Sequence, residues 1–166
     1  MLNCSVRIVN LVLQFLTAVS EVLALVYLVM LLYTHCVLAG EFRSSVLMYV
    51  YFLPGITAES VIFVLCRVCC FSVGLDPIAI VFNLASGVLC TFTSLIMLLS
   101  MLDHCGNEYQ YKFFIAGGFG LLAGILHLLN GVICNIYLPA EEWIYAKPSK
   151  RVRKRLHAAW LREKSP

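Results

Sequence analysis

FFIAGGFGLLAGILHLLNGVICNIYL, residues 113–138, decides the fold, because it contains no Asp, Glu, Lys or Arg. A bilayer core about 30 Å thick needs about 20 apolar residues in a helix, so this stretch is long enough to span a membrane. Three more runs of this kind occupy roughly residues 9–33, 46–66 and 77–102. The sequence therefore predicts four membrane-spanning helices.

The composition supports a membrane protein. Of the 166 residues, 61% are hydrophobic and 13% charged, and the mean hydropathy is +0.91. The runs lack the dyad alternation of a barrel strand, so we expect an all-α membrane protein, an antiparallel four-transmembrane-helix bundle. Residues 1–8 form an N-terminus, 9–138 the transmembrane domain and 139–166 a tail. We find no nucleotide-binding, metalloprotease or nucleophile motif, and expect no enzyme activity, cofactor or metal site.

Basic residues predict the orientation. Cytosolic termini would place Arg7, Arg67 and the eight Lys and Arg of residues 139–166 inside, and leave Arg43 and Lys112 outside. The positive-inside rule therefore puts both termini in the cytosol, as in a multi-pass protein of the plasma membrane or an endomembrane.

The tail from residue 147 to 164 has the pattern of a basic amphipathic helix. Such a segment beside a span is suited to an anionic inner leaflet, whereas nucleic acid is a poor partner for it. The alternative is a solvated tail that only satisfies the positive-inside rule. The residues expected to bind anionic lipid are Lys150, Arg151, Arg153, Lys154 and Arg155.

The predicted topology sorts the cysteines by compartment. Cys36 and Cys105 fall in the two outer loops, where they either form a disulfide or stay free. A second group lies at the inner ends of the spans, where palmitoylation and unmodified thiols are the two interpretations. This group is Cys4, Cys66, Cys69 and Cys70. The C-x-x-C spacing in it lacks the second pair that a structural zinc site needs.

Polar residues inside the spans need partners, since a charge at the bilayer centre costs at least ~2.5 kcal/mol. Counting ~1.5 Å per residue places Glu21, Glu59 and His127 at similar depth, with Asn130 one turn from His127. We expect these four to face the bundle interior. Glu21, Glu59 and His127 could form a proton- or ion-conducting site. The favoured interpretation is hydrogen-bonded contacts between helices, in which each Glu is protonated and donates to His127, Asn130 or a backbone carbonyl.

The fourth span carries small residues at steps of three and four, which allow close helix packing. The third span has a matching stripe with Asn83 and Cys90 in it, so we expect the two to face each other. The alternative is an outward seam that dimerises the protein. The glycines of the seam are Gly117, Gly120, Gly124 and Gly131.

The predicted layout of four spans, short loops and cytosolic ends is accompanied by DP at 76–77, VFNLA at 81–85 and HLLN at 127–130. On these features the chain resembles the MARVEL-domain family over roughly residues 7–138. The resemblance implies a non-enzymatic membrane-organising or scaffold role in membrane apposition, vesicle trafficking or cell junctions. Its partners would be membrane lipids, other membrane proteins or further copies of itself. Two alternatives are a small proton or ion channel or transporter, and a membrane thiol oxidoreductase that uses Cys66 and Cys69.

Overall fold

The computed structural model describes residues 2–33, 43–70, 76–102 and 110–137. Several predictions lie outside these residues: the disulfide between Cys36 and Cys105 and the whole tail with its lipid-binding cations. The side chains of Cys4 and Cys70 also lie outside the described part.

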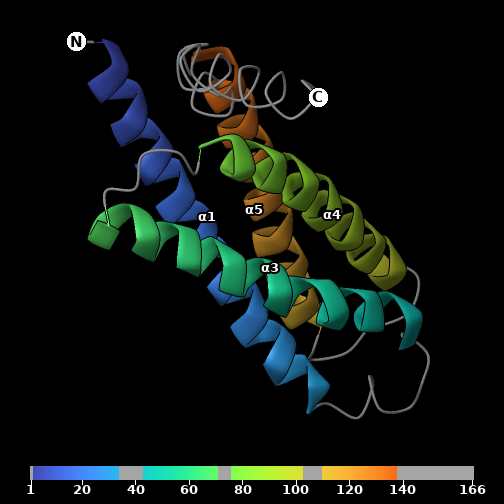
Figure 1. Ribbon diagram of the computed structural model, residues 1–166. Helices are drawn as coiled ribbons and strands as arrows, with labels where there is room; N and C mark the ends of the chain where they lie inside the picture. Colours follow the sequence, from blue (N-terminus) through green and yellow to red (C-terminus); the bar gives the residue numbers. More distant parts are fainter. Residues whose placement is uncertain (1, 34–42, 71–75, 103–109, 138–166) are drawn as a thin grey trace, which may run out of the picture.

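The described chain forms four long helices, α1 (Leu2–Leu32), α3 (Arg43–Cys70), α4 (Asp76–Leu102) and α5 (Gln110–Tyr137). Each contains a stretch long and apolar enough to cross a membrane, within a few residues of the predicted spans. The start of α1 and the end of α5 lie at the same end of the bundle (Figure 1). The predicted four-helix bundle is confirmed, and the chain is a multi-pass membrane protein.

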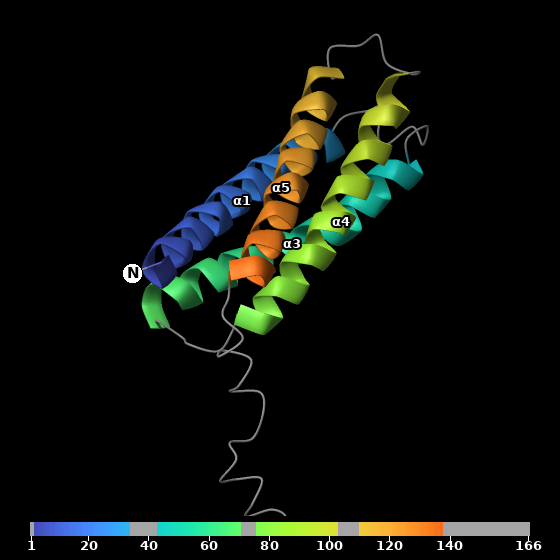
Figure 2. The ribbon, with the colours of Figure 1, turned by 90° about the horizontal axis from the view of Figure 1, so that it is seen from above.

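Helix α5 is the centre of the bundle, since it packs against both α1 and α4 (Figure 2). Its glycine seam is entirely buried: Gly117, Gly120, Gly124 and Gly131 all face neighbouring helices. The seam therefore lies inside the bundle rather than on an outer, dimerising surface.

The closest approach of α4 and α5 occurs at Gly87 and Gly124. A Cβ added to Gly124 would lie 2.8 Å from the backbone nitrogen of Thr91 and 3.2 Å from the carbonyl oxygen of Gly87. One added to Gly87 would lie 3.0 Å from the backbone nitrogen of Leu128. Only glycine lets the two backbones come this close, and close contact is what holds helices together in lipid.

The stripe of α4 that meets the seam differs by one position from the predicted one. Gly117, Gly124 and Gly131 face Leu98, Thr91 and Leu84, respectively. The predicted stripe, which includes Asn83, Cys90 and Met97, is also buried. Two adjacent stripes of α4 are thus covered, and Asn83 of the predicted stripe contacts His127 of α5 and Gln14 of α1.

Helix α3 lies obliquely across the other helices (Figures 1 and 2). It continues through Pro54, and its packing against α1 and α4 leaves a large part of its surface exposed. Tyr49 anchors its first half, donating a hydrogen bond from its hydroxyl to the carbonyl oxygen of Ala116 on α5 at 2.9 Å.

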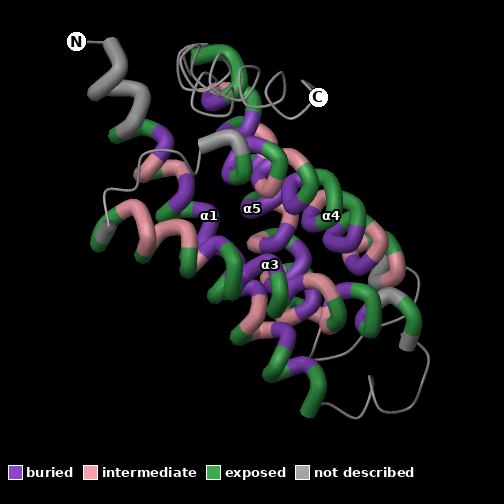
Figure 3. Tube along the Cα trace, viewed as in Figure 1, coloured by how far each residue is buried: buried purple, intermediate pink, exposed green. Residues whose placement is uncertain are grey.

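The interior changes character along the bundle axis, and Figure 3 shows the buried stripes that make it up. The half toward the α1–α3 and α4–α5 connections holds an apolar cluster. The half toward the termini contains most of the buried polar side chains. The apolar cluster consists of Ala24, Leu28, Leu31, Val46, Tyr49, Leu53, Met97, Phe113 and Ala116.

Candidate functional site

A polar stripe on α1 forms one wall of the site. Asn10, Gln14, Thr17 and Glu21 follow one another at steps of four, three and four, so they share one face of the helix. All four are buried, and Gln14, Thr17 and Glu21 are fully so. The same face continues as Ala24, Leu28 and Leu31. Glu21 is therefore the last polar group of this stripe before the apolar cluster.

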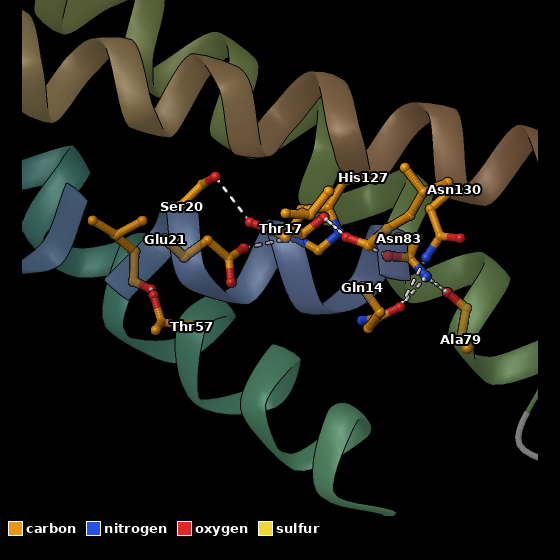
Figure 4. A network of polar contacts seen from close by, with 12 residues as sticks. Gln14, Thr17, Ser20, Glu21, Thr57, Ala79, Asn83, His127 and Asn130 are labelled. Atoms are coloured by element: carbon orange, nitrogen blue, oxygen red, sulfur yellow. Dashed lines mark hydrogen bonds and ion pairs between the residues drawn. The ribbon is translucent and has the colours of Figure 1, made fainter. Parts of the chain in front are cut away.

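Glu21 meets His127 of α5 in the centre of the bundle. His127 Nε2 lies 2.6 Å from Glu21 Oε1, and neither side chain has any exposed surface. Phe82 packs edge-on against the imidazole, with ring centroids 5.6 Å apart. Figure 4 shows the two side chains pointing toward each other from α1 and α5. The sequence-predicted pairing of Glu21 with His127 is thus present in the structure.

Asn83 of α4 determines whether the second ring nitrogen of His127, Nδ1, carries a hydrogen. Its Nδ2 donates to the carbonyl oxygen of Ala79 at 2.7 Å, which leaves Oδ1 to face His127 Nδ1 at 2.7 Å. An amide oxygen only accepts, so His127 Nδ1 carries a hydrogen and donates it. The contacts of Asn83 therefore assign one proton of the imidazole.

Because two unprotonated acceptor atoms would repel each other at 2.6 Å, His127 Nε2 and Glu21 Oε1 need one proton between them. If it lies on oxygen, a carboxylic acid donates to a neutral imidazole; if on nitrogen, a carboxylate accepts from an imidazolium. The net charge of the pair is zero in both cases. A neutral pair suits the membrane interior, where an isolated ionised group is expensive.

Gln14 and Asn130 extend these contacts toward the terminal end. Asn130 Nδ2 donates to Gln14 Oε1 at 2.8 Å, and Asn83 Nδ2 approaches the same oxygen at 3.4 Å. The thiol of Cys134 in turn lies 3.6 Å from Asn130 Oδ1. Three helices, α1, α4 and α5, are thereby joined by side-chain hydrogen bonds. We call Gln14, Glu21, Asn83, His127 and Asn130 the polar network.

Two members of the network were absent from the predicted cluster. Gln14 lies seven residues before Glu21, and Asn83 lies on the predicted buried stripe of α4. Both positions were visible as buried faces in the sequence. The partner of each side chain was not, because it depends on how far the helices slide and rotate against one another.

Glu59 does not belong to the network, and the expectation that it faces the interior is wrong. Its side chain is exposed on the surface of α3. The buried side of that turn carries Ile56, Thr57 and Ser60 instead. Depth counting gives the level of a residue in the membrane but not the direction in which it points, and the oblique packing of α3 turns Glu59 outward.

Two atoms of the network keep unused hydrogen-bonding capacity. Glu21 Oε2 and Gln14 Nε2 are buried and have no hydrogen-bond partner within the described part of the chain. Most buried polar atoms in proteins are paired. The carboxyl of Glu21 is thus bound to His127 through one oxygen only.

The cysteines fall into two environments. Cys90 and Cys134 are buried, whereas Cys66 is half-buried and Cys69 is exposed near the end of α3, and none of these four described cysteines forms a disulfide. Among the described residues, no group of three or more His, Cys, Asp or Glu side chains is arranged to hold a metal ion.

Comparison with known proteins yields no relative. The chain matches no protein-family model, no curated protein and no solved structure. The MARVEL-domain resemblance therefore stays a prediction.

Proposed function

We propose that the chain is a non-enzymatic membrane-organising protein, in which the polar network holds the bundle in one arrangement. The hydrogen-bonded series Glu21, His127, Asn83 carries this proposal, since it joins one side chain from each of three helices. Apolar helices in lipid have no hydrophobic driving force that favours one neighbouring helix over another. Hydrogen bonds between helices make a particular pairing more stable. A fixed bundle then presents constant outer faces to lipid and to other membrane proteins.

The apolar half of the bundle favours this role over ion conduction. Beyond Glu21, the interior is filled by buried apolar side chains such as Leu28, Leu53 and Phe113. An ion crossing there would lose its hydration and meet few polar groups in exchange. Glu59, the third member of the expected conducting site, lies on the outside of α3.

A liposome experiment tests the structural role against conduction. Purified wild type, Glu21→Gln and Glu21→Leu are reconstituted under an imposed pH gradient, and proton flux and the free energy of unfolding are both measured. We expect no flux above protein-free liposomes for any of them, and a larger loss of stability in Glu21→Leu than in Glu21→Gln. Wild-type flux that Glu21→Gln abolishes would show a conducting site and refute the proposal.

The organising role itself is tested in cells. Proximity labelling from a tagged C-terminus, combined with imaging, identifies the membrane and the neighbouring proteins. We expect a reproducible set of membrane-protein neighbours that loses its clustering when the protein is depleted. Neighbours that match those of an unrelated four-span protein, and that stay clustered after depletion, contradict an organising role.

In this role both termini lie in the cytosol, and Cys69 near the end of α3 is palmitoylated. Cys69 is exposed there, so its thiol is available to reagents and to acyl transfer. A membrane-impermeant thiol reagent should label Cys69 only after permeabilisation, with Cys69→Ser as the control. Acyl exchange on the same pair of proteins tests palmitoylation. If Cys69 is labelled in intact cells that express the protein at the surface, this end of α3 faces the outside and the proposed orientation is wrong.

Proton uptake from the terminal side is a second candidate function. Two observations favour it: Glu21 Oε2 has no hydrogen-bond partner among the described residues, and the polar stripe of α1 runs from Glu21 toward the terminal end, whereas the same face of α1 is apolar beyond Glu21. Such a site binds a proton from one side without passing it across the membrane. Infrared spectra at two pH values test this, because proton uptake requires a carboxylic acid band that changes with pH and disappears in Glu21→Gln. A carboxylic acid band that does not change with pH would contradict proton uptake and support a purely structural role for Glu21.

A further inference from the structure

The outward side of α3 contains small residues and a carboxyl group that no other described helix covers. Its exposed positions repeat at steps of three and four through the middle of the helix. We call this set of residues the α3 outer face: Tyr51, Pro54, Gly55, Ala58, Glu59 and Ile62.

Glu59 lies in the middle of the membrane on this face. It is within two residues, or about 2 Å of helix rise, of the centre of the membrane-spanning stretch Val46–Cys69. No hydrogen bond or ion pair links the side chain of Glu59 to any residue of 2–33, 43–70, 76–102 or 110–137. A charged side chain facing lipid at this depth costs at least ~2.5 kcal/mol, and intramembrane carboxyl groups normally face a protein or water-lined interior. The monomer therefore leaves Glu59 in an unfavourable environment.

The same face is shaped for close contact with another helix. A Cβ added to Gly55 would meet nothing within 4 Å. Ala58 lies next to Glu59 and adds only a methyl group to the surface. Small residues at such positions let two membrane helices approach until backbone and side chains touch.

We propose that the α3 outer face binds the α3 outer face of a second copy, with the two Glu59 side chains hydrogen-bonded to each other. Copies inserted in the same orientation are related by a two-fold axis along the membrane normal, so Glu59 of one copy meets Glu59 of the other at the same depth. A protonated carboxyl has one donor and an acceptor oxygen, which makes it complementary to itself. The pairing buries both groups without any net charge in lipid.

This inference rests on the membrane-organising role proposed above and names self-association as part of it. The glycine seam of α5 is buried between helices. Self-association through α3 thus leaves the packing of α4 on α5 unchanged, and the protein dimerises as a folded bundle.

Cysteine cross-linking in native membranes tests the interface. Ala58→Cys places a thiol on the α3 outer face, and Val88→Cys places one at similar depth on the lipid-facing side of α4, where Val88 is 60% exposed. Both are compared with the wild type, which has the same native cysteines. We expect oxidation to give a disulfide-linked dimer with Ala58→Cys, and no more dimer with Val88→Cys than with the wild type. Equal cross-linking at both sites, or none at either, overturns the inference.

Two substitutions of Glu59 test the carboxyl pair, with dimer fraction measured by single-molecule photobleaching of tagged protein in nanodiscs. Glu59→Leu removes the hydrogen bonds and should weaken the dimer about tenfold, which corresponds to about 1.4 kcal/mol. Glu59→Gln keeps a donor and an acceptor and should retain most of the dimer. A dimer unaffected by Glu59→Leu, or a cross-link from Ala58→Cys to a different protein in place of a second copy, refutes the homotypic pairing.

Failure of this inference is distinguishable from failure of the proposed function. A monomer that keeps its specific neighbours in proximity labelling overturns self-association alone. A dimer without specific neighbours supports the α3 interface and overturns the organising role.

Discussion

The contact between Gly124 and α4 gives the sharpest test of the fold, because α5 supplies its own control. Gly124→Ala places a methyl group against α4, where it would lie 2.8 Å from the backbone nitrogen of Thr91. An ordinary contact begins at 3.4 Å, so the two helices must separate by about 0.6 Å, the difference between these values. The hydroxyl of Thr91 is nearer still, but it belongs to a side chain. The backbone nitrogen moves only with the helix.

Gly118→Ala makes the same chemical change on the same helix without this obstacle. Gly118 is exposed, and a Cβ there meets nothing within 4 Å. Both substitutions gain the higher helix propensity of alanine, about 1 kcal/mol. Only Gly124→Ala also suffers overpacking, which costs about 1–3 kcal/mol. We therefore expect Gly124→Ala to be about 1–3 kcal/mol less stable than Gly118→Ala.

Reversible unfolding in mixed micelles by titration with SDS measures this difference directly. Comparison of the two variants with each other, rather than with the wild type alone, cancels the helix-propensity term and isolates the interhelical contact. Equal stability of Gly118→Ala and Gly124→Ala would refute the packing of α4 against α5 described here, since the added methyl group would then have met free space at both positions.

Three further substitutions test the interior by the same titration. Glu21→Leu leaves His127 Nε2 buried without a partner and should cost about 1–3 kcal/mol, whereas Glu21→Gln still donates to that nitrogen and should cost less; equal losses would argue against a shared proton. Tyr49→Phe removes the hydrogen bond to the carbonyl of Ala116 and should cost about 0.5–1.5 kcal/mol, so an unchanged unfolding midpoint would contradict that contact.

The buried glycine seam is the part of the interior that sequence reasoning described best. Steps of three and four place its residues on one face of α5 whatever the neighbouring helices do, because the helix period is a local property. The structure buries all of these glycines. The stripe of α4 that meets them is shifted by one position from the predicted one, whereas Asn83 of the predicted stripe meets His127 on the same helix as the glycines.

Some members of the polar network were predicted from the sequence, but most of the contacts between them were not. Glu21, His127 and Asn130 were predicted to meet from their depth, and the structure brings them into one network. Asn83 decides which nitrogen of the imidazole carries a proton, and that role follows only from its contacts on both sides. Hydrogen-bond partners separated by 44 and 106 residues in the chain are set by packing, not by local pattern.

The sequence by itself determined the number of spans, their approximate ends and the placement of the start of α1 and the end of α5 at one end of the bundle. These properties depend on the length and hydrophobicity of each segment, which the bilayer thickness converts directly into helices. The tertiary structure alone decided that Glu21 is enclosed and Glu59 exposed, although both are single carboxylates near the middle of an apolar span. The reason is physical: depth follows from position in the helix, whereas the direction of a side chain follows from how that helix packs against its neighbours.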